Sequence, residues 1–303
     1  MPIRRCVGCT LPVPDGMPGR RFKQVDVFTA TPLAGNPVAV VLDAEGLDDV
    51  TMQRFAAWTN LSETTFVLPP TTAAADYRLR IFHPRAELPF AGHPTLGSAH
   101  AVLEGGLVTP RDGVVRQECG AGILPVRVDG ARLAVRVPEA KVVRGADVDG
   151  DALARSLGCP IAGAPLAIDV GPVWLIAEIG DEATVRGLAP DIAAIDRLSR
   201  PRGLTGVTVF ALPAQTGAPV VVRSFAPAAG VPEDPVCGTG NAAVGAYLGV
   251  TGRIASTGPA FRASQGREVG RDGTVDVTVT AGGSLVEIAG TSVTVIDGHV
   301  TGL

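Results

Sequence analysis

One stretch, residues 82–104 with the sequence FHPRAELPFAGHPTLGSAHAVLE, constrains the fold more than any other part of the chain. It opens like the end of a strand, turns at Gly92 and continues through Pro94 into apolar residues at helical spacing that stop at Gly105. Proline is tolerated at a helix start because the first helical amides have no intrahelical partner. The stretch therefore predicts a glycine turn and a helix beginning at Pro94, whose free amides are suited to holding an anion.

A second stretch, residues 225–248 with the sequence FAPAAGVPEDPVCGTGNAAVGAYL, has the same plan. Both stretches begin Phe-x-Pro, pass through acidic residues and proline, and enter a glycine turn before an alanine-rich helix. Aligned at the turn, residues 91–93 correspond to residues 237–239, with three extra residues in the second copy. Repetition at about half the chain length indicates a duplication with two similar domains, rather than a chance likeness of two loop-helix joints.

Short strands dominate the rest of the pattern and helices are few, which favours an α+β fold over a doubly wound sheet. The two repeated helices have almost no polar face, and such helices are buried. We therefore expect two pseudo-symmetric domains, each a curved mixed sheet or barrel around one central helix. The domains are predicted at residues 21–138 and 139–303, with a last strand that could return to the first domain. Residues 1–20 are predicted to be a disordered extension.

Composition limits the function classes. The 303 residues are 46% hydrophobic and 18% charged, as in a soluble globular protein with a sizeable core. The net charge of −4 argues against nucleic acid or an anionic membrane as a partner. The uncharged run at residues 203–222 contains turn residues, so it indicates two strands and not a membrane span. The expected partner is therefore a small molecule.

The cysteines are odd in number and scattered: Cys6, Cys9, Cys119, Cys159 and Cys237. This usage indicates reduced thiols in a cytoplasmic protein, and no secretory signal precedes the predicted globular part. The pair Cys6 and Cys9 could bind a metal or be redox-active, but we favour a mobile tail. The four histidines are dispersed and the chain has no second CxxC, so neither a metal nor a cofactor is predicted.

Several motifs carry a resemblance to a known family: PLAGNPVAVV at 32–41, NLSETTF at 60–66, LPFAGHPTLG at 88–97, CGAGILPV at 119–126 and FAPAAGVPEDPVCGTGNAA at 225–243. From residue 25 to about residue 296 the chain resembles the PhzF-like isomerases of phenazine biosynthesis. That family shares the diaminopimelate epimerase fold, two pseudo-symmetric domains with the active site in the cleft between them. The resemblance implies an isomerase that needs no cofactor and acts in secondary-metabolite or antibiotic biosynthesis. In that family a glutamate moves a proton between carbons of a small cyclic or unsaturated amino acid, such as trans-2,3-dihydro-3-hydroxyanthranilate.

The resemblance also implies which residues form the site. The catalytic glutamate falls on Glu63, and the groups that assist it fall on His93 and Asp234. The predicted substrate-binding residues are Asn36, Ser62, Gly92, Cys237, Gly238 and Thr239.

Physical chemistry supports the three catalytic candidates without excluding simpler roles. Glu63 in an apolar cleft would have a raised pKa and could move a proton, but it could instead cap the local backbone. His93 at a helix N-terminus would stay neutral, although a capping or core histidine is the alternative. Asp234 could bind a substrate ammonium or merely form a turn. His83 and His100 are given no role.

Cys237 departs from the isomerase pattern. The related epimerases use two catalytic thiols, and a cysteine before a helix N-terminus would have a lowered pKa. The corresponding position in the first copy is Ala91, so a two-thiol mechanism is unavailable, and a small buried cysteine is the favoured interpretation. Two other functions stay open: a racemase or epimerase using Cys237 with Glu63, and an inactive binding protein.

Two features of the assembled molecule are also expected. The helices starting at Pro94 and Gly240 should meet at their N-termini, with a substrate carboxylate between them. Barrel-like domains leave edge strands, and pairing of such edges predicts a homodimer.

Overall fold

The computed structural model describes residues 19–146, 148–215 and 217–303. Most of the predicted N-terminal extension, with Cys6 and Cys9, lies outside the described residues. Arg20 already belongs to the first strand, one residue before the expected start of the globular part.

The first half of the chain comprises β1 (Arg20–Val27), β2 (Asn36–Val41), α1 (Asp49–Thr59), β3 (Glu63–Leu68), β4 (Tyr77–His83), β5 (Ala86–Leu88), α2 (Gly92–Glu104), β6 (Val114–Cys119), β7 (Gly122–Asp129) and β8 (Arg132–Arg136). The second half comprises β9 (Lys141–Val142), α3 (Gly150–Leu157), β10 (Leu166–Asp169), β11 (Val173–Glu178), α4 (Glu182–Gly187), α5 (Ile192–Ser199), η1 (Arg200–Arg202), β12 (Gly206–Ala211), β13 (Val220–Ala226), η2 (Pro227–Ala229), β14 (Val231–Asp234), α6 (Gly238–Val250), η3 (Arg253–Ser256), β15 (Ala260–Gln265), η4 (Arg267–Val269), β16 (Gly273–Thr280), η5 (Ala281–Gly283) and β17 (Leu285–Val300).

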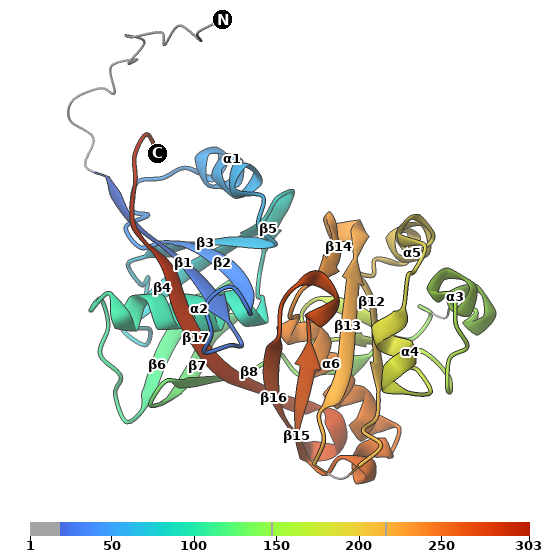
Figure 1. The fold of residues 1–303 in the computed structure, drawn as a ribbon. Helices are drawn as coiled ribbons and strands as arrows, with labels where there is room; N and C mark the ends of the chain where they lie inside the picture. Colours follow the sequence, from blue (N-terminus) through green and yellow to red (C-terminus); the bar gives the residue numbers. More distant parts are fainter. Residues whose placement is uncertain (1–18, 147, 216) are drawn as a thin grey trace, which may run out of the picture.

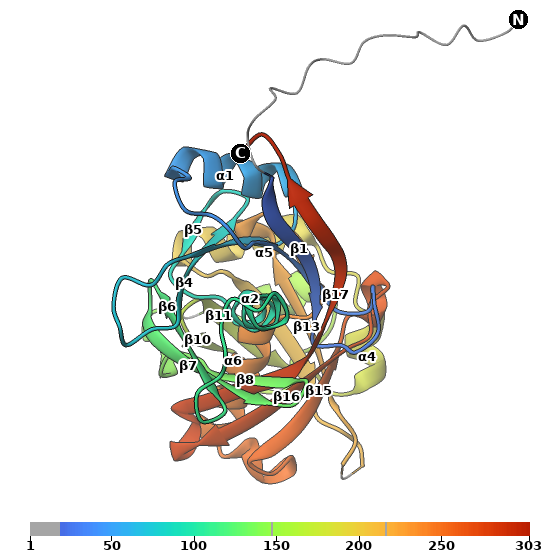
Figure 2. The ribbon, with the colours of Figure 1, turned by 90° about the vertical axis from the view of Figure 1, so that its left-hand side faces the viewer.

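The strands of the first half close into a barrel around α2. Hydrogen-bonded neighbours follow the order β17, β1, β2, β3, β4, β6, β7, β8 and back to β17. The pairs β2–β3 and β4–β6 are parallel, and the other pairs in this ring are antiparallel. Figure 2 shows α2 end-on with strands around it.

The second half repeats this plan around α6. Its strands follow the order β17, β16, β15, β13, β12, β11, β10 and β9, with the parallel pairs β13–β15 and β11–β12. The short strand β14 attaches to β13 as β5 attaches to β4. The predicted α+β class with two similar halves is therefore confirmed. Figure 1 shows the halves side by side, with β17 running from the second into the first. The boundary between residues 138 and 139 stays a prediction.

The two central helices are buried on nearly all sides, as their missing polar faces predicted. Each begins two residues earlier than expected, α2 at Gly92 and α6 at Gly238. The reason is that Ala91 and Cys237 are both extended and act as the N-caps. Pro94 is thus the third helical residue, still within the first turn, where its missing N–H is harmless.

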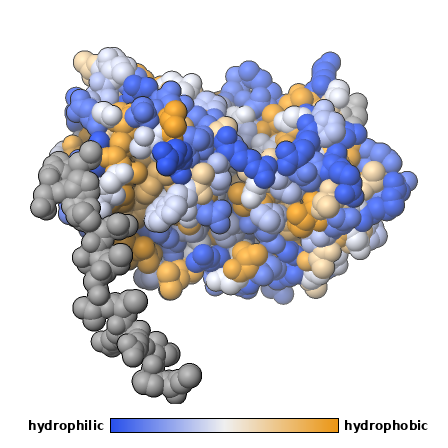
Figure 3. All heavy atoms as spheres, turned by 90° about the horizontal axis from the view of Figure 1, so that it is seen from above, coloured by the Kyte–Doolittle hydropathy of each residue, from blue (hydrophilic) through white to orange (hydrophobic). Residues whose placement is uncertain are grey.

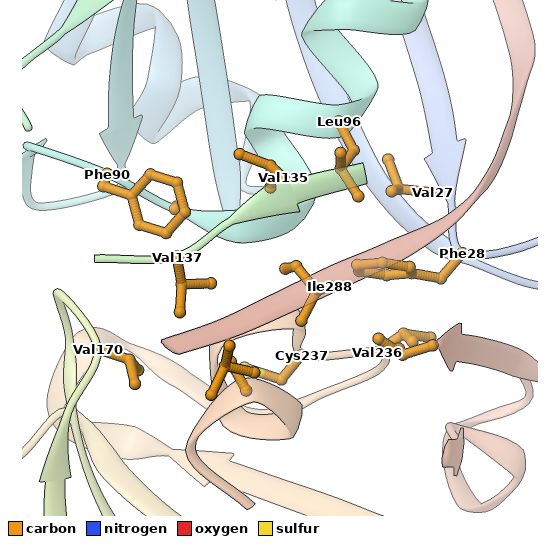
Figure 4. Close-up of a cluster of buried hydrophobic side chains, with 14 of the residues drawn as sticks. Val27, Phe28, Phe90, Leu96, Val135, Val137, Val170, Val236, Cys237 and Ile288 are labelled. Atoms are coloured by element: carbon orange, nitrogen blue, oxygen red, sulfur yellow. The ribbon is translucent and has the colours of Figure 1, made fainter. Parts of the chain in front are cut away.

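One hydrophobic core joins the two halves. Figure 4 shows Val27, Phe28 and Leu96 of the first half on one side of Ile288 in β17, and Val236 and Cys237 on the other. Outside this core, hydrophilic and hydrophobic residues are interspersed on the upper face (Figure 3). No helix among the described residues is long and apolar enough to cross a membrane. The shared core fixes how the two central helices meet.

Candidate active site

The N-termini of α2 and α6 meet at the junction of the halves, as predicted. A Cβ atom added at Gly92 would lie 3.4 Å from Gly238 Cα and 2.7 Å from Ile288 Cδ1. One added at Gly238 would lie 3.2 Å from the His93 backbone nitrogen. Side chains at either glycine would separate the helix ends, so glycine keeps two sets of free helical amides together.

Glu63 and His93 come together beside these helix ends. Glu63 is the first residue of β3, its side chain is 15% exposed, and its Oε2 lies 3.3 Å from His93 Nε2. The two atoms are near each other but not aligned for a hydrogen bond, and neither has a partner among the described residues. Buried polar atoms are nearly always paired in folded proteins, so this pair is the arrangement expected where a ligand binds.

Asn36 links the histidine to Asp234. Its side-chain Nδ2 donates to Asp234 Oδ1 at 2.7 Å and to the Val236 carbonyl at 2.9 Å, and it lies 3.3 Å from His93 Nδ1. An NH₂ group has two hydrogens, and the two shorter bonds, to Asp234 and Val236, can use both. The longer contact therefore places Asn36 beside His93 Nδ1 without fixing which ring nitrogen carries the proton. Ser62 Oγ donates to Asn36 Oδ1 at 3.4 Å, which adds a fifth predicted site residue to the network.

Burial dominates the protonation states of these groups. Burial and then the charge of Asp234 raise the pKa of Glu63 to about 8. Burial raises the pKa of Asp234 to about 6, against the hydrogen bonds that it accepts. Burial also lowers the pKa of His93 to about 3. The imidazole is therefore neutral at neutral pH, as expected, but desolvation and not the helix dipole is the cause.

The expectation of a lowered pKa for the Cys237 thiol is wrong. Burial, and then the negative charge of nearby Asp234, raise the pKa of Cys237 well above its usual value. The Sγ atom accepts a hydrogen bond from the Gly240 amide at 3.2 Å, so the side chain caps α6. Desolvation outweighs the helix N-terminus here because the side chain is nearly inaccessible to water. The thiol is thus a structural cap.

A cavity of about 440 Å³ opens at this site. Its lining residues are Ser62, Glu63, His83, Leu88, Trp174, Arg200, Gly203, Leu204, Thr205, Ala226, Ala228, Ala229, Val231 and Asp234. Among the predicted site residues, Ser62, Glu63 and Asp234 line it. The others are Asn36, His93, Cys237, Thr239 and the two helix-end glycines, all of which are buried.

The structure adds residues that the sequence analysis missed. Trp174 lines the cavity, and its indole Nε1 donates to Thr239 Oγ1 at 3.1 Å. His83, which we had set aside, also lines the cavity. Trp174 lies inside an ordinary buried strand and His83 at a strand end, so no local pattern distinguished either.

Gln265 is a further residue without a local signal. It is buried in β15 and braces the turn between β14 and α6. Its Nε2 donates to the Asp234 carbonyl at 2.9 Å, and its Oε1 accepts from the Cys237 amide at 3.1 Å and Asn241 Nδ2 at 2.8 Å. In the described part of the chain, no group of three or more histidine, cysteine or acidic residues is placed to hold a metal ion.

A closed barrel and a second curved sheet, each around a buried helix, with the buried Glu63 and His93 side chains where the helices meet, define a class of isomerase and epimerase fold. Residues 25–298 match the model of the phenazine biosynthesis-like (PhzC-PhzF) family, and the chain belongs to that family. The chain is 40% identical over 268 residues to antisense-enhancing sequence 1 of Schizosaccharomyces pombe, covering 85% of this chain and 90% of the relative. It is 33% identical over 288 residues to trans-2,3-dihydro-3-hydroxyanthranilate isomerase of Pseudomonas aeruginosa, covering 92% and 98%.

The solved structures agree. A PhzF-family protein of Bacillus anthracis superposes with a TM-score of 0.78 at 28% identity, covering 94% of this chain and 99% of that one. The protein is therefore an enzyme, an isomerase of the PhzF family.

Proposed function

We propose that this isomerase moves a proton between two carbons of a small cyclic or unsaturated amino acid, with Glu63 as the acid/base and without a cofactor. The observation that carries the proposal is the unpartnered Oε2 of Glu63, 3.3 Å from the unpartnered Nε2 of His93. A carboxylate whose pKa lies close to the working pH can both accept and return a proton, as general acid–base catalysis requires.

The surroundings support a substrate carboxylate at the two helix ends. The amides that follow Gly92 and Gly238 are fixed donors, and negative charge that grows as a proton leaves carbon is stabilised by such preorganised donors. In the tautomer that carries its proton on Nε2, neutral His93 is a further donor near Glu63. Asp234, once ionised, can accept from a substrate ammonium group. Candidate substrates are trans-2,3-dihydro-3-hydroxyanthranilate and dehydroproline-type amino acids, which would place the enzyme in secondary-metabolite or antibiotic biosynthesis.

Proton exchange tests the proposal directly. Dihydroaromatic and dehydroproline amino acids would be incubated with the enzyme in deuterated water, and deuterium at carbon would be followed by NMR. We expect incorporation at one substrate carbon, and a loss of about 10²–10⁴-fold in Glu63→Gln. The matched control is Glu87→Gln, a surface glutamate that pairs with Arg80 and does not line the cavity. Full exchange in Glu63→Gln would refute the proposal.

The racemase alternative has less support. It needs a reactive thiolate, whereas burial raises the pKa of Cys237, and Ala91 stands where a second thiol would be. Binding without exchange for every candidate would instead favour an inactive binding protein. We also propose a cytoplasmic location, because Cys119, Cys159 and Cys237 are free thiols.

A further inference from the structure

A single permanent positive charge lines the cavity on the wall formed by the second half. Of the described residues that line it, Arg200 is the only arginine or lysine. Arg200 is the first residue of η1, directly after α5, and its side chain is half exposed. Gly203, Leu204 and Thr205 continue the same wall, while Ser62, Glu63 and His83 come from the first half. The cationic group therefore belongs to a surface shared with the proposed acid/base.

One edge of the Arg200 guanidinium is already held. Its Nε donates to Asp196 Oδ2 at 2.7 Å, one helical turn earlier. Neither Nη atom has a hydrogen-bond partner among the described residues. A guanidinium carries five N–H donors in a planar fork, so the Asp196 contact orients the group and leaves further donors for a second acceptor.

The charged groups around the cavity indicate the chemical class of the second acceptor for Arg200. Two carboxylic groups, Glu63 and Asp234, also line the cavity. Glu63 lies beside His93 in the first turn of α2, where the proposed function places the first carboxylate of the substrate. A neutral distal substituent would gain little from a guanidinium. A carboxylate can take two parallel N–H bonds from it, which adds geometric specificity as well as energy.

We infer that Arg200 is a specificity-determining residue that binds a second carboxylate of the substrate, so that among small cyclic or unsaturated amino acids the preferred substrates are those with two carboxylates. The inference rests on the proposed function only for the position of the first carboxylate. Arg200 is not a catalytic residue in this scheme, because it acts at the end of the substrate away from the reacting carbon.

Binding of matched acids and amides tests this inference. The probes are aspartate and asparagine, glutamate and glutamine, and 2-aminoadipate and its 6-amide, which differ in charge at nearly constant shape and vary the reach. Trp58→Phe leaves Trp174, which lines the cavity, as the only tryptophan of the chain, so its fluorescence reports occupancy. We expect the acid of at least one pair to bind about five- to tenfold more tightly than its amide, as for one partly exposed charged hydrogen bond.

Two variants locate the effect. Arg200→Met should abolish the preference for the acid. Arg197→Met should keep it, because Arg197 lies in the last turn of α5, just before Arg200, and is paired with Asp191 but does not line the cavity. Equal binding of acid and amide in every pair, binding of neither, or a preference that survives in Arg200→Met would overturn the inference. Deuterium exchange is measured separately. If exchange still depends on Glu63 but no acid binds more tightly than its amide, this inference is rejected and the proposed function stands.

Discussion

The protonation of Glu63 depends on a residue 171 positions away in the chain, because the negative charge of Asp234 contributes to its raised pKa. As a base, Glu63 must be ionised, so kcat/KM should rise with pH through about 8 and level off above it. In Asp234→Asn this rise should move to lower pH, since the repelling charge is removed and the carboxylate ionises more easily.

The measurement is the pH profile of kcat/KM for wild type and Asp234→Asn, on any substrate that shows exchange. A rise that stays at the same pH in both proteins would mean that the profile reports another group. A profile that falls through pH 8 would assign Glu63 the role of acid in the first step.

For Cys237, which lies at the same junction, we expect substitution to change the stability of the protein and not its turnover. Because its thiol is buried and protonated, Cys237→Ala should leave turnover within about twofold of wild type. It should also lower the stability by about 0.5–2 kcal/mol through loss of the α6 cap. Cys237→Ser keeps an acceptor for the Gly240 amide and should recover part of that loss. Turnover and thermal midpoints check both variants, and a large loss of turnover in Cys237→Ser with an unchanged midpoint would restore the thiol mechanism.

At the scale of the elements, the contact between α2 and α6 depends on space at Gly92. A Cβ there would lie 2.7 Å from Ile288 Cδ1, so Gly92→Ala should cost roughly 1–3 kcal/mol by overpacking and slow turnover as the helix ends shift. Ile288→Val removes that Cδ1 atom. The double variant should therefore be more stable than the sum of the two single changes predicts.

Chemical denaturation of the four proteins in this cycle gives the coupling energy. Gly298→Ala is the matched control, because a Cβ at this β17 glycine would meet nothing within 4 Å. If the two changes were simply additive, the Ile288 methyl would not be the atom that limits Gly92.

At the scale of the whole molecule, the strands in the closed ring of the first half have a partner on both sides, whereas some other strands keep one unpaired edge. Among the described strands, β5, β9 and β14 each pair with one neighbour, β4, β10 and β13 respectively. Unpaired strand edges are commonly covered by another chain. We therefore predict a homodimer, to be measured by sedimentation velocity over a range of micromolar concentrations. A single species at the monomer mass of 30.9 kDa would contradict it.

Local patterns were sufficient for much of the fold. Asp48 directly precedes the first helix and is a residue type that favours the N-cap position, and its side chain accepts from the Thr51 amide at 2.7 Å. The capping signal works because it involves only residues a turn apart. The strands β5, β9 and β14 carry no clear local signal, because they are only two to four residues long and are defined by the neighbours with which they pair.

The sequence by itself determined the repeated turn and helix, the burial of both central helices and the family. It also determined the identity of Glu63, His93 and Asp234 as candidates. Only the tertiary structure placed Glu63 Oε2 3.3 Å from His93 Nε2, inverted the expected pKa shift of Cys237, and brought Trp174, Gln265 and Arg200 to the site. The reason is physical. Helix and turn signals arise between neighbouring residues, whereas desolvation and charge coupling depend on which remote segments pack together.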